Sequence, residues 1–480
     1  MFLRRAPKPK VMVIGLDCAD PDLVFSRWRR ELPNLSRVIQ AGVYGPLRSV
    51  TPPITVPAWM CMMTGRDPGE LGVYGFRNRT DYSYDKLAIA NSASIGEETV
   101  WDVLSREGKD CIVIGVPPTY PVKPLRGSLI SCFLTPGSET QFTYPHDLRD
   151  EVQKVADEYM VDVKGFRTAN KEWLLSQIYA MTTKRFTVAK HLLKTRPWDF
   201  FMMVEMGTDR IHHGFWHFMD AQHVLYPGCN SFETAIHDYY VYLDSLVGEL
   251  LDFADEHTRV LIVSDHGAKR MDGAVCLNEW LVQKGYLALK KYPSEPTRLE
   301  NLDVDWSRTR AWSEGGYYGR IFVNVAGREP QGTVPPSEYD RVCRELKLEL
   351  EGLCDPQGHP MGTTVVGSDD AYRETRNIAP DLSVFFGDLY WRASGMVGGG
   401  TLYTRHNDTG PDGANHDWHG VFAMAEGRDL SSARAGRALQ RLNLLDVAPT
   451  ILQTYGIAAL PGMGGRLITP KRMMAEQCAS

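Results

Sequence analysis

The feature that most restricts the fold is a series of short apolar runs, each followed by a loop and a stretch with helical periodicity. Four such runs are predicted to be strands, at residues 11–16, 111–116, 200–205 and 259–264. Continuous apolar runs of this length are typical of central strands that are covered on both faces. Helices are predicted between them, for example over residues 172–194 and 232–256. This alternation predicts an α/β fold, a three-layer sandwich with a mainly parallel central sheet.

Residues 286–370 show a different pattern and are interpreted as an inserted cap. They contain a Gly-rich aromatic stretch at 315–319 and a charged helix predicted over 336–352. The chain is then expected to return to the core through the strand-like run at 381–386. A chain of 480 residues is long for one compact core, which agrees with an insertion. The predicted organisation is a core of residues 1–285 and 371–480, with residues 286–370 as the cap.

Composition and charge narrow the classes of function. Hydrophobic residues make up 43% of the chain, enough to build a core. The net charge is -6, whereas proteins that bind duplex nucleic acid usually carry a basic face, so no such partner is expected. No apolar stretch has the length needed to span a bilayer, so no membrane partner is expected either. Nine cysteines at irregular spacings are typical of a reducing compartment and predict a cytoplasmic location. The sequence does not predict an oligomeric state.

Acidic residues follow three of the predicted strands at the point where each strand ends. Asp17 follows the first run, Asp209 lies just beyond the run at 200–205, and Asp265 with His266 follows the last run. In open α/β sheets, ligands bind outside the carboxyl ends of the strands. Three carboxylates at one edge would repel one another unless cations lay among them. The pattern therefore predicts a metal site.

Histidines supply further candidate ligands. Asp209 and His213 are four residues apart, which places them on one face of a helix where they can hold one ion. The alternative is an Asp at the helix N-cap with an exposed His, and His212 and His217 remain candidates. A later loop contains His416 and His419, either of which can be a ligand, the other orienting a neighbour or facing water.

Thr55 is the candidate nucleophile. Pro57 suits the first turn of a helix, which places Thr55 at or just before the N-cap. One interpretation is a threonine that only caps the helix. The other is a hydroxyl at a helix N-terminus, where backbone N–H groups and the helix dipole favour a phosphate. A divalent cation beside it would lower the pKa of the hydroxyl.

Taken in order, these motifs resemble the type I phosphodiesterase/nucleotide pyrophosphatase branch of the alkaline phosphatase superfamily. The likeness runs from about residue 11 to about residue 466. Further stretches that resemble bacterial and archaeal members lie at residues 64–69, 118–121, 327–330 and 446–450.

The resemblance implies two divalent metal ions, commonly zinc and sometimes manganese. One ion would be held by Asp209, His213 and His416, and the other by Asp17, Asp265 and His266 together with the oxygen of Thr55. His416 is preferred to His419 because the ligand of the family lies four residues before a glycine, which here is Gly420.

The activity implied by the resemblance is hydrolysis of phosphate diesters or nucleotide pyrophosphate bonds through a phospho-threonine intermediate, with a small phosphate ester as substrate. Alternatives are a phosphomonoesterase, a phosphonate hydrolase, a transferase or a non-catalytic binding protein on the same fold. Threonine at the nucleophile position, with Cys61 out of place, disfavours a sulfatase. Arg210 and Tyr120 are candidate phosphate-binding groups. Aromatic residues that favour a diester are Trp216, Phe218, Trp312, Tyr317 and Tyr318.

Overall fold

A central ten-stranded sheet organises the molecule in the computed structural model, which describes residues 8–432 and 435–469. The order along the sheet is β22-β2-β21-β9-β1-β8-β5-β6-β7, and β23 also pairs with β2. β1 lies between β9 and β8 and is parallel to both. The strands are β1 (Lys10–Leu16), β2 (Val43–Arg48), β5 (Cys111–Ile114), β6 (Gly127–Ile130), β7 (Thr143–Tyr144), β8 (Phe200–Glu205), β9 (Thr258–Val263), β21 (His419–Glu426), β22 (Arg437–Ala438) and β23 (Leu442–Asn443).

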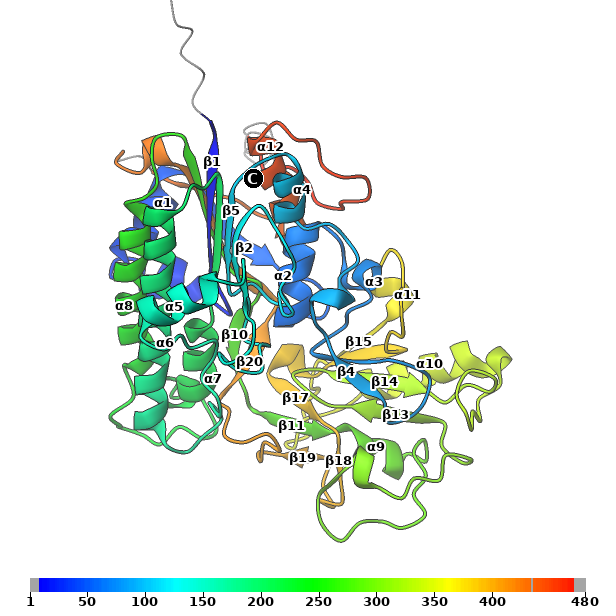
Figure 1. Ribbon diagram of the computed structural model, residues 1–480. Helices are drawn as coiled ribbons and strands as arrows, with labels where there is room; N and C mark the ends of the chain where they lie inside the picture. The colour runs from blue at the N-terminus through cyan, green and yellow to red at the C-terminus, as the bar shows by residue number, and fades with distance from the viewer. Residues whose placement is uncertain (1–7, 433–434, 470–480) are drawn as a thin grey trace, which may run out of the picture.

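Helices cover both faces of this sheet and complete the three layers (Figure 1). One layer consists of α1 (Pro33–Ala41), α5 (Leu148–Ala156), α6 (Lys171–Thr195), α7 (Gly207–Met219) and α8 (Ala235–Leu251). The other consists of α2 (Thr55–Thr64), α3 (Pro68–Leu71), α4 (Val100–Arg106) and α12 (Val447–Thr454). Every residue of β5 and β8 is buried, because both faces of these strands are covered. The predicted fold class is confirmed.

A second body of structure, the appended unit (residues 273–404), packs beside the carboxyl edge of the central sheet (Figure 1). Its antiparallel sheet has the order β13-β14-β16-β15, and a smaller sheet has the order β17-β11-β19. The elements are β11 (Gly273–Cys276), α9 (Leu277–Gln283), β12 (Thr297–Arg298), β13 (Ala311–Glu314), β14 (Gly319–Val323), α10 (Tyr339–Glu351), β15 (Thr364–Gly367), α11 (Ser368–Ala371), β16 (Leu382–Phe385), β17 (Trp391–Ser394), β18 (Met396–Val397) and β19 (Tyr403–Thr404).

The appended unit begins before and ends after the predicted cap at 286–370. Its hydrophobic core extends in sequence from Val275 to Ala393 and includes Trp280 of α9. The predicted return to the central sheet at 381–386 is wrong, because β16 pairs with β14 and β15 instead. An apolar run of this kind fits the middle of either sheet, so the run alone does not identify its partners. The first seven and last eleven residues of the predicted core lie outside the described residues.

Two short ladders complete the architecture. β10 (Gly267–Arg270) pairs with β20 (Ala414–Asp417), and β3 (Arg77–Arg79) pairs with β4 (Leu87–Ile89). The first ladder aligns Ala268 with His416 and so returns the late part of the chain to the edge of the central sheet. Within 8–432 and 435–469, the helices are all too short or too polar to cross a membrane.

Candidate active site

Three acidic side chains converge at the carboxyl edge of the central sheet because their strands are neighbours. Asp17 directly follows β1, and Asp265 follows β9 by one residue. Asp209 lies in the first turn of α7, which begins just after β8. All three side chains are buried. The sheet order therefore places the predicted carboxylates together.

Asp209 and His213 lie on the same face of α7, as their spacing of four residues predicts. Nε2 of His213 lies 3.2 Å from Oδ1 of Asp209, one turn away on the same face of α7. Both residues are buried, and the residue at the N-cap is Met206, so the alternative of a capping Asp with an exposed His does not apply. His212 faces another direction, with Nε2 3.2 Å from the hydroxyl of Tyr240.

His416 joins this pair from β20. The possible ligand atoms of Asp209, His213 and His416 lie within 4.8 Å of one another, and we call these residues the helix cluster. His416 is buried, whereas His419 is exposed at the start of β21. Side chains alternate between the two faces of extended chain, so His416 and His419, three positions apart, point in opposite directions. His416 is the one that points toward the site.

A second group, the strand cluster, contains Asp17, Asp265 and His266. Its possible ligand atoms also lie within 4.8 Å of one another, and all three side chains are fully buried. Oγ1 of Thr55 lies 3.2 Å from Nε2 of His266, so the hydroxyl belongs to this group. Thr55 is the first residue of α2, one position later than predicted, because Ile54 occupies the N-cap. The imidazoles of His266 and His416 stack with ring centroids 3.7 Å apart, which joins the two clusters.

The three histidines all use the same ring nitrogen, Nδ1, for a contact that fixes the ring from outside the clusters. Nδ1 of His416 lies 2.8 Å from the carbonyl oxygen of Pro53, and Nδ1 of His266 lies 3.0 Å from that of Gly267. Nδ1 of His213 lies 2.8 Å from Oδ1 of Asp412. Because carbonyl oxygens accept only, Nδ1 of His266 and of His416 carries the proton, and Nε2 of these two histidines keeps a free lone pair. This is the arrangement in which outer partners orient metal-binding histidines.

The strand cluster carries uncompensated negative charge. Oδ1 of Asp17 and Oδ2 of Asp265 are buried without a hydrogen-bond donor among the residues that the structure describes. Burial, and then the neighbouring carboxylates, raise the pKa of both groups well above the usual range. The remaining oxygen of Asp17 accepts a hydrogen bond of 2.6 Å from the indole N–H of Trp59. Unpaired carboxylate oxygens beside a free imidazole nitrogen fit a divalent cation.

The helix cluster is better compensated. Although burial opposes ionisation, His213 and Arg210 lower the pKa of Asp209. Burial also disfavours the charged form of His213, yet Asp412 and Asp209 raise its pKa to about 9. Its oxygen and nitrogen donors fit a divalent ion as well as those of the strand cluster do.

Asp412, Arg167 and Tyr317 form a network behind His213 that the sequence did not reveal. The Asp412 side chain is fully buried and accepts hydrogen bonds from Tyr317 at 3.0 Å and from Nε of Arg167 at 3.1 Å. The Tyr317 ring lies 4.2 Å from that of His416. Asp412 lies four residues before His416 in a Gly- and Asp-rich loop, but no spacing rule distinguishes it from Asp408. The general rule that a metal-binding histidine hydrogen-bonds to a nearby carboxylate would have made both residues candidates.

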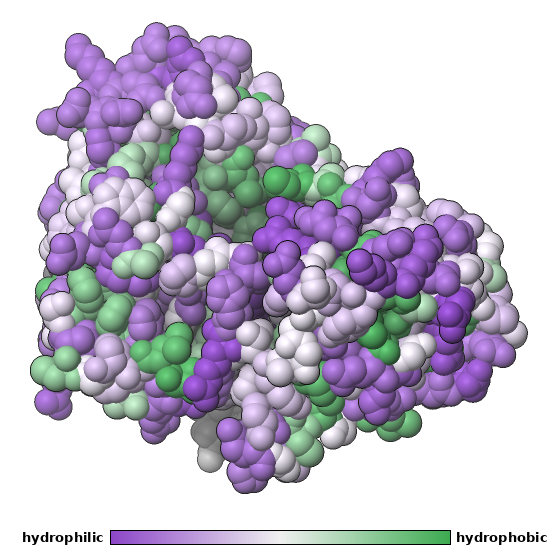
Figure 2. Space-filling view, turned by 90° about the horizontal axis from the view of Figure 1, so that it is seen from below, coloured by the Kyte–Doolittle hydropathy of each residue, from purple (hydrophilic) through white to green (hydrophobic). Residues whose placement is uncertain are grey.

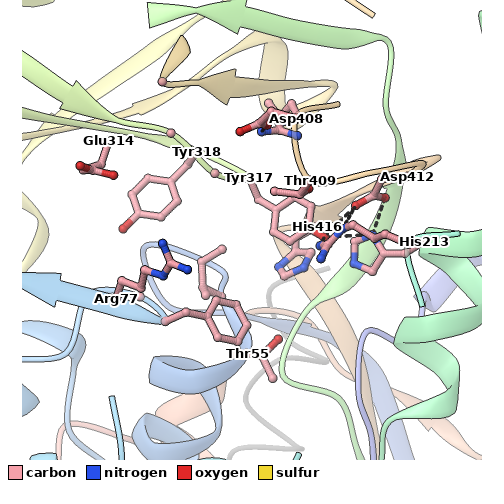
Figure 3. A pocket seen from close by; sticks show the side chains of 18 of the residues that line it. Thr55, Arg77, His213, Glu314, Tyr317, Tyr318, Asp408, Thr409, Asp412 and His416 are labelled. Carbon is pink, nitrogen blue, oxygen red and sulfur yellow. Dashed lines mark hydrogen bonds and ion pairs between the residues drawn. The ribbon is translucent and has the colours of Figure 1, made fainter. Parts of the chain in front are cut away.

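A pocket of about 480 Å³ opens above Thr55, between the central domain and the appended unit. Figure 3 shows Thr55 with His213, His416 and Asp412 on one side, and Arg77, Glu314 and Tyr318 on the other. From below, the surface is largely hydrophilic, with hydrophobic residues gathered around a hollow between a broad and a narrower part of the molecule (Figure 2).

The aromatic lining of this pocket differs in part from the predicted set. Tyr317 and Tyr318 line it, but Trp216, Phe218 and Trp312 do not; the other aromatic residues in the lining are Phe76, Phe133 and Phe166. Trp312 lies in the core of the appended unit, and Trp216 and Phe218 pack on the main core. Among the candidate phosphate-binding groups, Arg210 lines the pocket and Tyr120 does not.

Two buried acid–histidine clusters and a hydroxyl, at the carboxyl edge of a parallel sheet, define a site suited to metal-dependent hydrolysis of esters. A sequence model of the type I phosphodiesterase/nucleotide pyrophosphatase family matches residues 11–412. The chain belongs to this family, as predicted. A search of curated protein sequences finds no match.

Solved structures show the same fold at low sequence identity. Human ectonucleotide pyrophosphatase/phosphodiesterase 5 is 14% identical, with 95% of this chain and 97% of that chain covered and a TM-score of 0.52. The murine protein of the same name is 14% identical, with 94% and 96% covered and a TM-score of 0.51. The likeness extends over nearly the whole of each chain, so it includes the appended unit as well as the central sheet.

Proposed function

We propose that this protein hydrolyses phosphate diesters or nucleotide pyrophosphate bonds, with Thr55 as the nucleophile. The observation that carries the proposal is the hydroxyl of Thr55 at the first position of α2, 3.2 Å from Nε2 of His266 and at the base of the pocket. Because Nδ1 of His266 already donates to a carbonyl group, the hydroxyl donates to Nε2. A threonine that only capped the helix would not need such a neighbour.

The two clusters would hold two divalent ions, zinc or manganese by donor type. Asp209, His213 and His416 would bind one ion, and Asp17, Asp265, His266 and the Thr55 oxygen the other. When bound, the ions would lower the pKa of the hydroxyl and offset charge on the attacking and leaving oxygens. The unpaired oxygens of Asp17 and Asp265 support this assignment.

The residues of the chain orient and complete the reaction. Oγ1 of Thr55 forms a bond to phosphorus while the bond from phosphorus to the ester oxygen breaks, and the alcohol or phosphate leaves. Water then attacks the phospho-threonine, which restores the hydroxyl and releases the second product. The N-terminus of α2 directs backbone N–H groups and the positive end of the helix dipole at the reacting phosphate.

The charges around the site favour a diester over a monoester. A monoester carries an additional negative charge that needs a free cation near phosphorus. Arg210 is already paired: it donates to both oxygens of Asp162, at 2.9 and 2.8 Å, and contacts Asp209. Arg167 is likewise paired with Asp412. The aromatic lining also suits the second ester group of a diester.

The test is hydrolysis of bis-(p-nitrophenyl) phosphate against p-nitrophenyl phosphate by protein loaded with zinc or manganese. We expect the diester to be preferred, Thr55→Ala to lose activity by about a thousandfold or more, and Thr55→Ser to keep a measurable part of it. A preference for the monoester that is lost in Thr55→Ala would instead assign the site to a phosphomonoesterase. Activity of Thr55→Ala equal to that of the parent would contradict the proposed nucleophile.

A further inference from the structure

The pocket is large enough to receive much more than a phosphoryl group. Its volume of about 480 Å³ falls within the range of about 300–1,000 Å³ that is usual for small-molecule sites. The wall that faces away from the two clusters includes Arg77, which precedes the body of the appended unit in the chain, and Glu314 and Tyr318 of the appended unit (Figure 3). A considerable part of the substrate beyond the reacting phosphate therefore meets this distal wall.

The arginines nearest the clusters have their charge neutralised by carboxylates. Arg167 pairs with Asp412, and Arg210 pairs with Asp162 and Asp209. Arg392 pairs with Asp408 at 2.6 Å. These pairs leave little net charge in this part of the pocket lining, apart from the two clusters.

The distal wall has a different balance of positive and negative charge. Outside the pairs named above, Arg77, Arg298 and Arg320 line the pocket, and none of them forms an ion pair with a carboxylate among residues 8–432 and 435–469. The acidic residues there are Glu300 and Glu314. Arg320 is the cross-strand neighbour of Glu314, and it donates a hydrogen bond to the backbone carbonyl of Arg77. Three arginines against two glutamates leave one positive charge in excess.

Arg77 is the arginine of this wall that is held least firmly, since its charge acts on Glu314 without an ion-pair contact among residues 8–432 and 435–469. Its exposed side chain makes no hydrogen bond or ion pair with any residue that the structure describes. Figure 3 shows its guanidinium group reaching into the pocket from the side opposite His213, beside Tyr318. A second donor in the same lining is unsatisfied, because Nε of Arg392 is buried without a hydrogen-bond partner. Free guanidinium donors in a pocket favour an anion.

We propose that Arg77 determines specificity by binding a second anionic group of the substrate, a carboxylate or a phosphate remote from the reacting phosphorus. The inference rests on the proposed function, because it concerns the same pocket and the same substrate. The aromatic residues Phe76, Phe133 and Tyr318 pack against the organic part between the two anionic groups. The substrate class is thus a phosphodiester or pyrophosphate with an acidic tail.

The test uses p-nitrophenyl phosphodiesters whose second ester group carries a tail of increasing length. The tail ends in a carboxylate, in a phosphate, or in the neutral carboxamide of the same shape. At the best length, we expect kcat/KM for an anionic tail to exceed that for the carboxamide by about ten- to a hundredfold, since a hydrogen bond to a charged group contributes about 1.5–3 kcal/mol. Comparison of the carboxylate and phosphate tails identifies which anion the pocket prefers.

Arg77→Gln is expected to remove most of this preference, so that kcat/KM for the anionic tail falls to about that for the carboxamide. Arg77→Lys should restore part of it, and the preference should weaken with added salt. Arg308→Gln is the matched control, because it removes the same charge from an exposed arginine of the appended unit that does not line the pocket. Equal preference in Arg77→Gln and the parent, or no preference in the parent at any length, would overturn the proposal.

A binding measurement distinguishes failure of the anion site at Arg77 from failure of the proposed hydrolytic function. The same esters are titrated into metal-loaded Thr55→Ala protein, with and without Arg77→Gln, and the dissociation constants are compared. Tighter binding of the anionic tail that depends on Arg77 supports the anion site even if no ester is hydrolysed. Equal binding of anionic and neutral tails in that experiment overturns the anion site, whether or not the parent hydrolyses bis-(p-nitrophenyl) phosphate.

Discussion

The helix cluster and the strand cluster contain the same kinds of side chain but differ in what surrounds them. In the helix cluster, Asp209 contacts His213 and Arg210, and His213 contacts Asp412 in turn. In the strand cluster, one oxygen each of Asp17 and Asp265 has no donor within the described part of the chain. The first group is therefore organised by the protein itself, whereas the second carries repulsion that a cation would relieve. A shared ligand set need not mean a shared energetic role.

The largest expected effect is a difference in sign: substitution of an aspartate should stabilise the metal-free protein in one cluster and destabilise it in the other. In metal-free protein, Asp265→Asn should raise the free energy of unfolding by about 1–3 kcal/mol, because burial and Asp17 disfavour the ionised carboxylate in the folded state. Asp209→Asn should lower it by about 3 kcal/mol, because Arg210 and His213 lose their partner. Urea denaturation of both variants measures this difference.

The same two variants should both lose activity on bis-(p-nitrophenyl) phosphate by about a thousandfold, since a bound ion contributes several kcal/mol to the transition state. If the free energy of unfolding changed with the same sign in both metal-free variants, the proposed difference between the clusters would be wrong.

The next effect concerns pH and the surroundings of the strand cluster. Asp20 is buried three residues after Asp17, and burial, partly offset by a hydrogen bond from Leu23, raises its pKa to about 7. The folded state then binds the proton more tightly than the unfolded state, so stability is greatest below about pH 4 and falls as the pH rises to about 7. The loss is on the order of 4 kcal/mol. Thermal unfolding against pH should show that fall in the parent and a smaller fall in Asp20→Asn, because Asp17 and Asp265 contribute in both.

A smaller effect should distinguish the outer partner of the helix cluster. Asp412→Asn should weaken metal binding at one of the two sites by about ten- to a hundredfold, because the hydrogen bond that orients His213 loses its charge. Isothermal titration with zinc in the presence of a competing chelator measures the affinity of each site. Asp408→Asn is the control, because Asp408 lies in the same loop but pairs with Arg392. Equal weakening by both substitutions would show a general effect of the loop.

The smallest effect links the appended unit to the helix cluster. Tyr317→Phe removes a hydroxyl that donates to Asp412 at 3.0 Å and accepts from Arg167. A hydrogen bond to a charged group contributes about 1.5–3 kcal/mol, but Asp412 keeps its bond from Arg167, so metal affinity at the same site should fall only a few-fold. Competition titration measures the change, and Tyr318→Phe serves as the control because its hydroxyl contacts the carbonyl of Tyr74 instead. An unchanged affinity in Tyr317→Phe would show that Arg167 alone maintains Asp412.

Local patterns in the sequence predicted the parts of the site that depend on local geometry. The four apolar runs became β1, β5, β8 and β9, and the residues that follow three of them met at one edge. The spacing of Asp209 and His213 was enough to place both on one face of a helix. Long-range pairing was beyond such patterns: the run at 381–386 joined a different sheet from the one expected. Likewise, Phe76, Phe133 and Phe166 reach the pocket from separate segments.

Tyr317 connects the appended unit to the helix cluster as well as to the pocket wall. It enters between β13 and β14, and its contacts with Asp412 and with the ring of His416 reach the helix cluster directly. The unit is therefore not a module that can be exchanged without further change. Replacing the appended unit by that of a relative would change the distal wall of the pocket and also the contacts of the helix cluster. Substrate specificity and the affinity for an ion at that cluster would therefore change together.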